Sequence, residues 1–286
     1  MILKAMTTPY LRSMVPADVE PATDMILRND WGVRRDWLEF ATSQADCFPV
    51  IAEADGTVVA TGVGTANGAV GWIGTIFVEP TWRGRGLGRA ITQSIIGSLD
   101  GAGCRALALV ATNEGRQLYE RMGFEVQTQY RILQAVGLPP IDAPDGVRSF
   151  RAADLPGLIA LDREGTGEDR THAITRFAAP ETTRVLVIGT GDDDGLDAFV
   201  IRAPWGGGAT VARTPEAALR IITARRRAAG PEGRVRVGLL DENAEGMARL
   251  TEVGFRLLWS APRMVRGEPR AWHPEWIYGQ FNHAMG

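Results

Sequence analysis

The chain has 286 residues, 45% of them hydrophobic, and a formal net charge of -3 at pH 7. This length and this apolar content are sufficient for two domains with ordinary hydrophobic cores. The small negative charge argues against a broad nucleic-acid-binding surface, because such binding depends on the neutralisation of phosphates.

The cysteines, the histidines and the absence of long apolar runs exclude several kinds of site and location. Cys47 and Cys104 lie far apart in sequence and next to no metal-ligand partner, so we expect no disulfide framework, no metal site and a reducing compartment. The chain has no apolar run long enough to span a membrane, and residues 1–14 lack the features of a secretory signal. We therefore expect a cytoplasmic protein without a membrane partner. All three histidines lie in the C-terminal half, which leaves the first half without a histidine base.

In chain order, the first half begins with a short strand near Arg12 that runs into a helix. Residues 50–54 and 57–64 predict an antiparallel pair of strands, and residues 72–78 predict the next strand. A helix, a strand, a second helix and further strands follow. This mixture predicts an α/β fold with a mostly antiparallel mixed sheet flanked by helices.

Residues 82–89, with the sequence WRGRGLGR, lie between the apolar run 72–78 and the amphipathic run 90–99. Glycines let the backbone approach a ligand closely, and the start of a helix directs unpaired N–H groups and a positive dipole end at it. Three arginines add charge of the matching sign: Arg83, Arg85 and Arg89. The expected ligand is therefore a phosphate.

The spacing within this loop decides between classes of phosphate site. A dinucleotide fingerprint is excluded because Arg89 stands where the third glycine would be, and a P-loop is excluded because Gly-Lys-Ser/Thr is absent. The pattern that fits is R-x-x-G-x-G, formed by Arg83, Gly86 and Gly88. It resembles the acetyl-CoA pyrophosphate loop of the GNAT acetyltransferases.

A second motif downstream extends this resemblance. The apolar run 104–111 is followed by a helical segment that ends in L-Y-E-x-x-G-F from Leu118 to Phe124. These residues resemble the later strand and helix of the family, so the likeness covers about residues 72–133. The alternative interpretation is a plain core stripe on an amphipathic helix that ends at Gly123.

The resemblance implies roles for particular residues. Backbone groups of the strand around Ile76, Phe77 and Val78 would bind the pantetheine arm, and one N–H would polarise the thioester carbonyl. The implied pyrophosphate anchor is the loop of Arg83, Gly84, Arg85, Gly86, Leu87, Gly88 and Arg89. Asn113 resembles an asparagine that the family places near the cofactor, and its counterpart in the second half would be Asn243.

Tyr119 matches the family tyrosine that protonates the departing CoA thiolate. The alternative is a core tyrosine whose hydroxyl is bonded to the backbone. No motif supplies the general base, because Trp72 stands where some members of the family carry a glutamate. Glu79 and Asp46 are candidates by location alone, and deprotonation through water or binding of a neutral amine is equally allowed.

Specificity for the acceptor should come from residues 29–37, which combine two tryptophans with both signs of charge. Trp31 and Trp37 fit either a binding pocket or ordinary core packing.

The second half repeats the first in altered form. Residues 12–19 are echoed by 148–155, and residues 119–124 by 250–255, with the second copy five residues shorter in between. The shortening falls at the loop, because a strand at 209–212 runs almost directly into a helix at 216–227 without R-x-x-G-x-G. Thr214 with Pro215 and Glu216 is a good helix start, so this half keeps the fold without the phosphate loop.

In this second copy Leu250 replaces Tyr119. The chain thus resembles tandem GNAT proteins with two GNAT-like α/β domains, the second of them degenerate. The Pro/Gly/Asp-rich stretch 137–146 predicts a linker between a catalytic acetyl-CoA-binding domain at 1–138 and a degenerate domain at 147–286.

The resulting expectation is an N-acetyltransferase that uses acetyl-CoA as cosubstrate, without a metal. It would act on a primary amine of a small molecule or peptide by direct attack in a ternary complex. The alternatives are transfer of another acyl group from acyl-CoA and a non-enzymatic acyl-CoA sensor, and retention of Tyr119 favours catalysis over the sensor. We expect no nucleic-acid partner, and the sequence leaves room for a homodimer.

Overall fold

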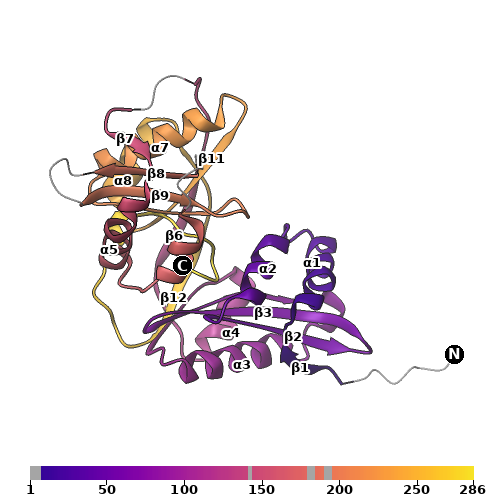
Figure 1. Ribbon diagram of the computed structural model, residues 1–286. Coiled ribbons are helices and arrows are strands. Elements are labelled where there is room, and N and C mark those ends of the chain that lie inside the picture. Colours follow the sequence, from indigo (N-terminus) through magenta and orange to yellow (C-terminus); the bar gives the residue numbers. More distant parts are fainter. Residues whose placement is uncertain (1–7, 141–143, 179–183, 190–194) are drawn as a thin grey trace. The chain divides into compact units, whose positions relative to one another are not determined.

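The computed structural model describes residues 8–140, 144–178, 184–189 and 195–286 (Figure 1). By its internal contacts the chain forms two compact units. Unit 1 comprises the chain up to Leu109 together with His283–Met285, and unit 2 comprises Val110–Asn282 with Gly286.

Unit 1 contains five strands in the order β1-β2-β3-β4-β5, antiparallel except for the parallel pair of β4 and β5. The strands are β1 (Tyr10–Ser13), β2 (Cys47–Ala54), β3 (Thr57–Asn67), β4 (Val70–Val78) and β5 (Ala106–Val110). The helices are α1 (Val19–Arg28), α2 (Arg35–Ser43) and α3 (Leu87–Gly101), with short 3-10 turns η1 (Pro16–Asp18) and η2 (Pro80–Trp82). Helices α1 and α2 cover one face of the sheet and α3 covers the other (Figure 1).

The close fit of α3 on the sheet depends on glycines in β3. A Cβ atom at Gly62 would come within 2.4 Å of Ile91 Cγ2, and one at Gly64 within 2.5 Å of Ile95 Cγ2. Ile91 and Ile95 are fully buried, so the absence of side chains on β3 lets the helix bury its apolar stripe against the strand.

A bulge in β4 sets the geometry of its second half. The register with β3 shifts between Thr61 and Val63, and Thr75 on β4 has a φ of 53°, a left-handed conformation that is strained for a β-branched residue. Two hydrogen bonds hold it: Trp37 Nε1 donates to Thr75 Oγ1 at 2.9 Å, and Thr61 Oγ1 donates to the Thr75 carbonyl at 3.0 Å.

Unit 2 contains a three-stranded group and a five-stranded sheet. In the group, β6 (Glu125–Val136) lies between β12 (Arg256–Gly267) and β11 (Arg234–Leu240) and is antiparallel to both. The sheet has the order β13 (Ile277–Gly279), β10 (Gly208–Ala212), β9 (Leu196–Arg202), β8 (Val185–Gly189) and β7 (Val147–Ser149). The helices are α4 (Asn113–Glu120), α5 (Leu155–Thr166), α6 (Thr171–Phe177), α7 (Pro215–Ala229) and α8 (Ala244–Glu252), with 3-10 turns η3 (Ala152–Asp154) and η4 (Pro274–Trp276).

The position of β6 explains why the compact units differ from the two sequence copies. This last strand of the first copy is hydrogen-bonded along its length to two strands of the second copy, and residues from both copies share one core around α7. The predicted domains describe two repeats of one fold, whereas the contacts divide the chain after Leu109. In the predicted linker 137–146, residues 141–143 lie outside the described part of the chain.

The duplication is visible in the turn that opens each copy. Arg12 Nη1 lies 2.6 Å from a carboxylate oxygen of Asp18, and Arg148 Nη1 lies 2.6 Å from one of Asp154. The arginine hydrogen bond holds the pKa of each aspartate below its usual value. The α/β class, with mostly antiparallel strands and flanking helices, is confirmed. In the described residues, no helix combines the length and the apolar character that crossing a membrane requires.

Candidate functional site

The glycine-rich loop forms an open helix start in unit 1. Gly84 and Gly86 have φ angles of 75° and 81°, and a Cβ at either position would meet no atom within 4 Å. Gly86 is the N-cap of α3, and the first intrahelical hydrogen bond joins Ala90 N to its carbonyl at 3.0 Å. The amides of the first helical turn therefore have no partner within the helix.

This start differs from those of α4, α7 and α8, although α1 and α5 also begin without a side-chain cap. In α4, α7 and α8 the N-cap side chains of Thr112, Thr214 and Asn243 accept a hydrogen bond from a backbone amide of the first turn. No such side-chain cap is present at Gly86. Of these four helices, α3 alone leaves this task to an external acceptor, for which a phosphate is well suited.

The arginines of the loop are exposed, and two of them donate hydrogen bonds to nearby backbone carbonyls. Arg83 Nε donates to the Val78 carbonyl at 3.2 Å, and Arg85 Nη2 donates to the Thr81 carbonyl at 3.2 Å. The Arg85 guanidinium also lies 4.7 Å from the centre of the Trp82 ring. The loop thus carries accessible positive charge beside the uncapped end of α3.

The strand that leads into the loop offers an edge that β5 does not use. The parallel register of β4 with β5 runs from Val70 to Trp72 and includes no later residue of β4. Phe77 and Val78 pair with β3 on the other side, and Ile76 lies at the bulge. An extended ligand can add to such an edge as a further strand would.

Tyr119 lies on α4, in unit 2. Its side chain is 8% exposed and packs against Phe124, with ring centres 6.0 Å apart. Burial raises its pKa to about 12. Within the described chain its hydroxyl makes no hydrogen bond, unlike the alternative of a core tyrosine tied to the backbone. The phenol is therefore a protonated donor at neutral pH.

The structure corrects the expected counterpart of Asn113. Asn243 is the N-cap of α8 and stands eleven residues before Gly254, whereas the residue eleven before Gly123 is Thr112, the N-cap of α4. Asn113 is the exposed first residue of α4. The equivalent pair is therefore Thr112 and Asn243, and a role of Asn113 at the cofactor stays a prediction.

The second copy has no comparable anion site in the described residues. Strand β10 passes through Arg213 into α7, whose start is closed by the Thr214 hydroxyl accepting from Ala217 N at 3.2 Å. Arg213 is paired with Glu164 at 2.7 Å and lies over Trp276. Its charge is thus already neutralised within unit 2.

The structure shows the surroundings of the candidate base Glu79 and of the tryptophans considered for the site. Glu79 faces α1, where Arg28 Nη2 lies 3.6 Å and Asn29 Nδ2 lies 3.3 Å from its Oε2, so it connects the end of β4 to that helix. Trp72 is buried in the core. Trp37 is 2% exposed and supports the β4 bulge, which agrees with core packing, whereas Trp31 is half-buried.

The first half of the sequence lacks a histidine, but the folded unit 1 contains one. His283 belongs to unit 1, and its carbonyl oxygen lies 2.5 Å from the position that a Cβ of Gly74 would occupy. Asn67 Nδ2, at the end of β3, donates to the Met285 carbonyl at 2.8 Å. No local pattern predicts this, because the contact joins residues more than 200 positions apart in sequence.

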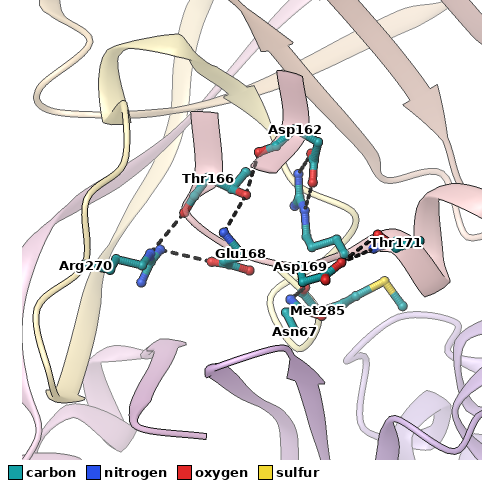
Figure 2. A network of polar contacts seen from close by, with 9 residues as sticks. Asn67, Asp162, Thr166, Glu168, Asp169, Thr171, Arg270 and Met285 are labelled. Atoms are coloured by element: carbon teal, nitrogen blue, oxygen red, sulfur yellow. Dashed lines mark hydrogen bonds and ion pairs between the residues drawn. The ribbon is translucent and has the colours of Figure 1, made fainter. Parts of the chain in front are cut away.

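Unit 2 also buries a compact set of charges (Figure 2). Arg170 Nε donates to Asp162 at 3.1 Å, and Arg270 donates to Glu168 at 3.0 Å and to the Thr166 carbonyl at 3.0 Å. Two arginines balance two carboxylates at the end of α5, as buried charges require. No group of side chains suited to a metal ion occurs in the described ranges of the chain.

Both copies of the chain match family models of acetyltransferases. Residues 12–124 match the model of the acetyltransferase (GNAT) family, and residues 158–279 match that of an acetyltransferase (GNAT) domain. An uncharacterized N-acetyltransferase, YitH, of Bacillus subtilis (strain 168) is 28% identical over 191 residues, which are 64% of this chain and 65% of that protein.

A holothin acyltransferase of Pseudoalteromonas sp. (strain SANK 73390) is 25% identical over 174 residues, 57% of each protein. The aligned parts therefore span less than two thirds of these two relatives. Among solved structures, a putative acetyltransferase from Pyrococcus horikoshii has the same fold, with a TM-score of 0.80, 18% identity, and coverage of 100% of this chain and 98% of the other.

Proposed function

Because this chain belongs to the GNAT acetyltransferases and carries two tandem domains of that family, we propose that it transfers an acetyl group from acetyl-CoA to a primary amine. The acceptor is a small molecule or a peptide. We assign cofactor binding to the first copy, residues 1–138, and treat the second, residues 147–286, as degenerate.

The observation that carries this proposal is the uncapped start of α3 beside an edge of β4 that β5 leaves unpaired. The amides of Leu87, Gly88 and Arg89, with the exposed arginines, suit the pyrophosphate of CoA. The edge around Ile76, Phe77 and Val78 suits the pantetheine arm, and a fixed amide there stabilises the oxyanion of the tetrahedral intermediate.

The reaction then needs a proton for the leaving group. As the resemblance of Tyr119 to the family tyrosine implies, the amine nitrogen attacks the thioester carbon, the C–S bond breaks, and the CoA sulfur accepts a proton from Tyr119. The amine releases its own proton to water, and the tyrosinate then regains a proton from water. Tyr119 retains its proton at neutral pH because burial raises its pKa to about 12. The reference pKa of a thiol is about 8.5, so transfer from Tyr119 is favourable only where burial raises the basicity of the CoA thiolate.

Transfer of a different acyl group is the second candidate function. The relative named holothin acyltransferase motivates it, and the pyrophosphate loop recognises CoA without reference to the acyl chain.

The test is release of CoA thiol from acetyl-CoA and other acyl-CoA donors across a panel of amines, with the wild type and Tyr119→Phe compared. We expect the variant to lower kcat roughly 10²- to 10⁴-fold, as loss of a general acid does, and to leave the Kd for CoA unchanged in calorimetry. Tyr10→Phe, at an exposed position on β1, is the matched control and should keep the wild-type rate.

Three other outcomes would change the assignment. An unaltered kcat in Tyr119→Phe would remove this residue from the reaction. Turnover of another donor alone would select the second candidate function. Tight CoA binding without thiol release for any donor and amine would favour the non-enzymatic sensor.

A further inference from the structure

One arginine of unit 1 is partly buried although no carboxylate of the described residues is paired with it. The Arg34 side chain is half-buried, and its Nη1 donates to the neighbouring Val33 carbonyl at 3.0 Å. Its guanidinium lies 5.5 Å from the centre of the Trp31 ring. No carboxylate of the described residues forms an ion pair with it, and burial lowers its pKa from the usual value.

The adjacent arginine shows the ordinary arrangement. Arg35 lies on the same segment and pairs with Glu20 and, at 3.6 Å, with Glu39. Burying a cation without an anion lowers the stability of the protein, whereas an ion pair at the surface changes the stability very little. The environment of Arg34 is therefore suited to an anion that arrives with a ligand.

Contacts within unit 1 connect Arg34 to the strand expected to hold the thioester. Trp31, which stacks under Arg34, packs on Phe77 of β4 with ring centres 5.4 Å apart. The positive charge of Arg34 also acts on His283, whose backbone lies against Gly74. We call Arg34, Trp31 and His283 the Arg34 cluster. It contacts β4 on both sides of the bulge, through Trp31 at Phe77 and through His283 at Gly74.

His283 adds a polar group to this cluster without adding a second cation. Burial, and secondarily the charge of Arg34, lower its pKa to about 4, so the imidazole is neutral at physiological pH. A ligand beside the cluster therefore meets one fixed positive charge, an aromatic face and a neutral imidazole.

We propose that Arg34 binds an anionic group carried by the acceptor, so that the acceptor is an amine that also bears a carboxylate or a similar anion. This inference rests on the proposed acetyl transfer and specifies its substrate class. A planar guanidinium binds a carboxylate with two parallel hydrogen bonds, which would orient the amine toward the thioester on β4. A phosphate of CoA is the other possible source of such an anion, and the experiment separates the two.

The experiment compares paired acceptors that differ in the anion alone, such as an amino acid and its amide. Wild type, Arg34→Gln and the matched control Arg35→Gln are assayed for kcat/KM with each acceptor at saturating acetyl-CoA. In Arg34→Gln we expect a 10- to 100-fold loss for the anionic acceptor, from charged hydrogen bonds worth about 1.5–3 kcal/mol, and less than a twofold change for the neutral one. Arg35→Gln should keep the wild-type ratio of kcat/KM between the two acceptors, because the charge of Arg35 is already paired within the protein.

Arg34→Lys should recover part of the loss, because a lysine keeps the charge and lacks the planar fork. Calorimetry should give the same Kd for CoA in Arg34→Gln as in the wild type. A weaker Kd for CoA would assign Arg34 to a cofactor phosphate and overturn the proposal. Equal losses for both acceptors, or none for either, would overturn it too. A wild-type enzyme that acetylates no amine would instead refute the proposed function on which it rests.

Discussion

At the scale of single residues, surroundings rather than residue type decide the chemistry of His283. Its lowered pKa means that the unfolded chain binds more protons than the folded chain between pH 6.5 and about 4. The contribution of the neutral imidazole to stability is therefore complete above pH 6.5 and is lost as the pH falls toward 4. The loss is at most about 3 kcal/mol, because the pKa falls from 6.5 to about 4 and the residue is half-buried.

We expect His283→Asn to flatten this pH dependence. The free energy of unfolding, measured with urea at pH 7 and pH 4.5, should fall less in the variant than in the wild type, by on the order of 2 kcal/mol. Paired aspartates such as Asp18 also destabilise the protein in acid, but they do so equally in both proteins. His273→Asn, in unit 2, is the control, because the His273 side chain is 43% exposed. Equal falls in the wild type and His283→Asn would show that His283 is charged in the folded protein at pH 4.5.

At the scale of elements, local sequence patterns predicted the features of helices and strands that depend on neighbouring residues in the chain. The glycines of 82–89 predicted the uncapped start of α3, and Thr214 with Pro215 predicted the closed start of α7. Contacts between distant segments were not predictable in this way. The isolation of Arg34, the placement of His283 and the strain at Thr75 all depend on tertiary neighbours that no window of sequence contains.

The start of α3 leads to a prediction with an internal control. In Gly86→Ala the φ of 81° costs an alanine about 1–2 kcal/mol, and the new methyl group faces the open side where the pyrophosphate would lie. We expect lower stability and a Kd for CoA raised at least tenfold. Gly97→Ala lies in the exposed middle of the same helix, where a Cβ meets no atom within 4 Å.

The control variant should change the stability in the opposite direction. Gly97→Ala should raise the free energy of unfolding by about 0.5–1 kcal/mol and leave CoA binding unchanged, because alanine favours the helix interior. The measurements are urea unfolding and calorimetric titration with CoA for both variants. An unchanged Kd in Gly86→Ala would argue against a phosphate at this loop.

At the scale of the whole molecule, the two sequence copies are not two independent bodies. Strand β6 ends the first copy, yet its hydrogen-bonding edges are filled by β11 and β12 of the second. The backbone just beyond it is also held there, since Gly137 N donates to Gly233 O at 2.8 Å and Leu138 N to Arg226 O at 2.9 Å. The repeat could be predicted from sequence, but this pairing could not, because both copies would offer equally suitable strands.

This arrangement predicts the behaviour of the separated copies. A fragment of residues 1–138 leaves β6 with two unpaired edges and exposes Tyr130 and Leu133, which are buried in the full chain. We therefore expect the fragment alone to aggregate or to lack a cooperative unfolding transition. Co-expression with residues 139–286 should restore a soluble complex, because the missing strands then arrive from the second fragment. Size-exclusion chromatography and circular dichroism of the fragment, the co-expressed pair and the full chain test this. A monomeric 1–138 fragment that unfolds cooperatively would show that β6 finds its partners within the first copy.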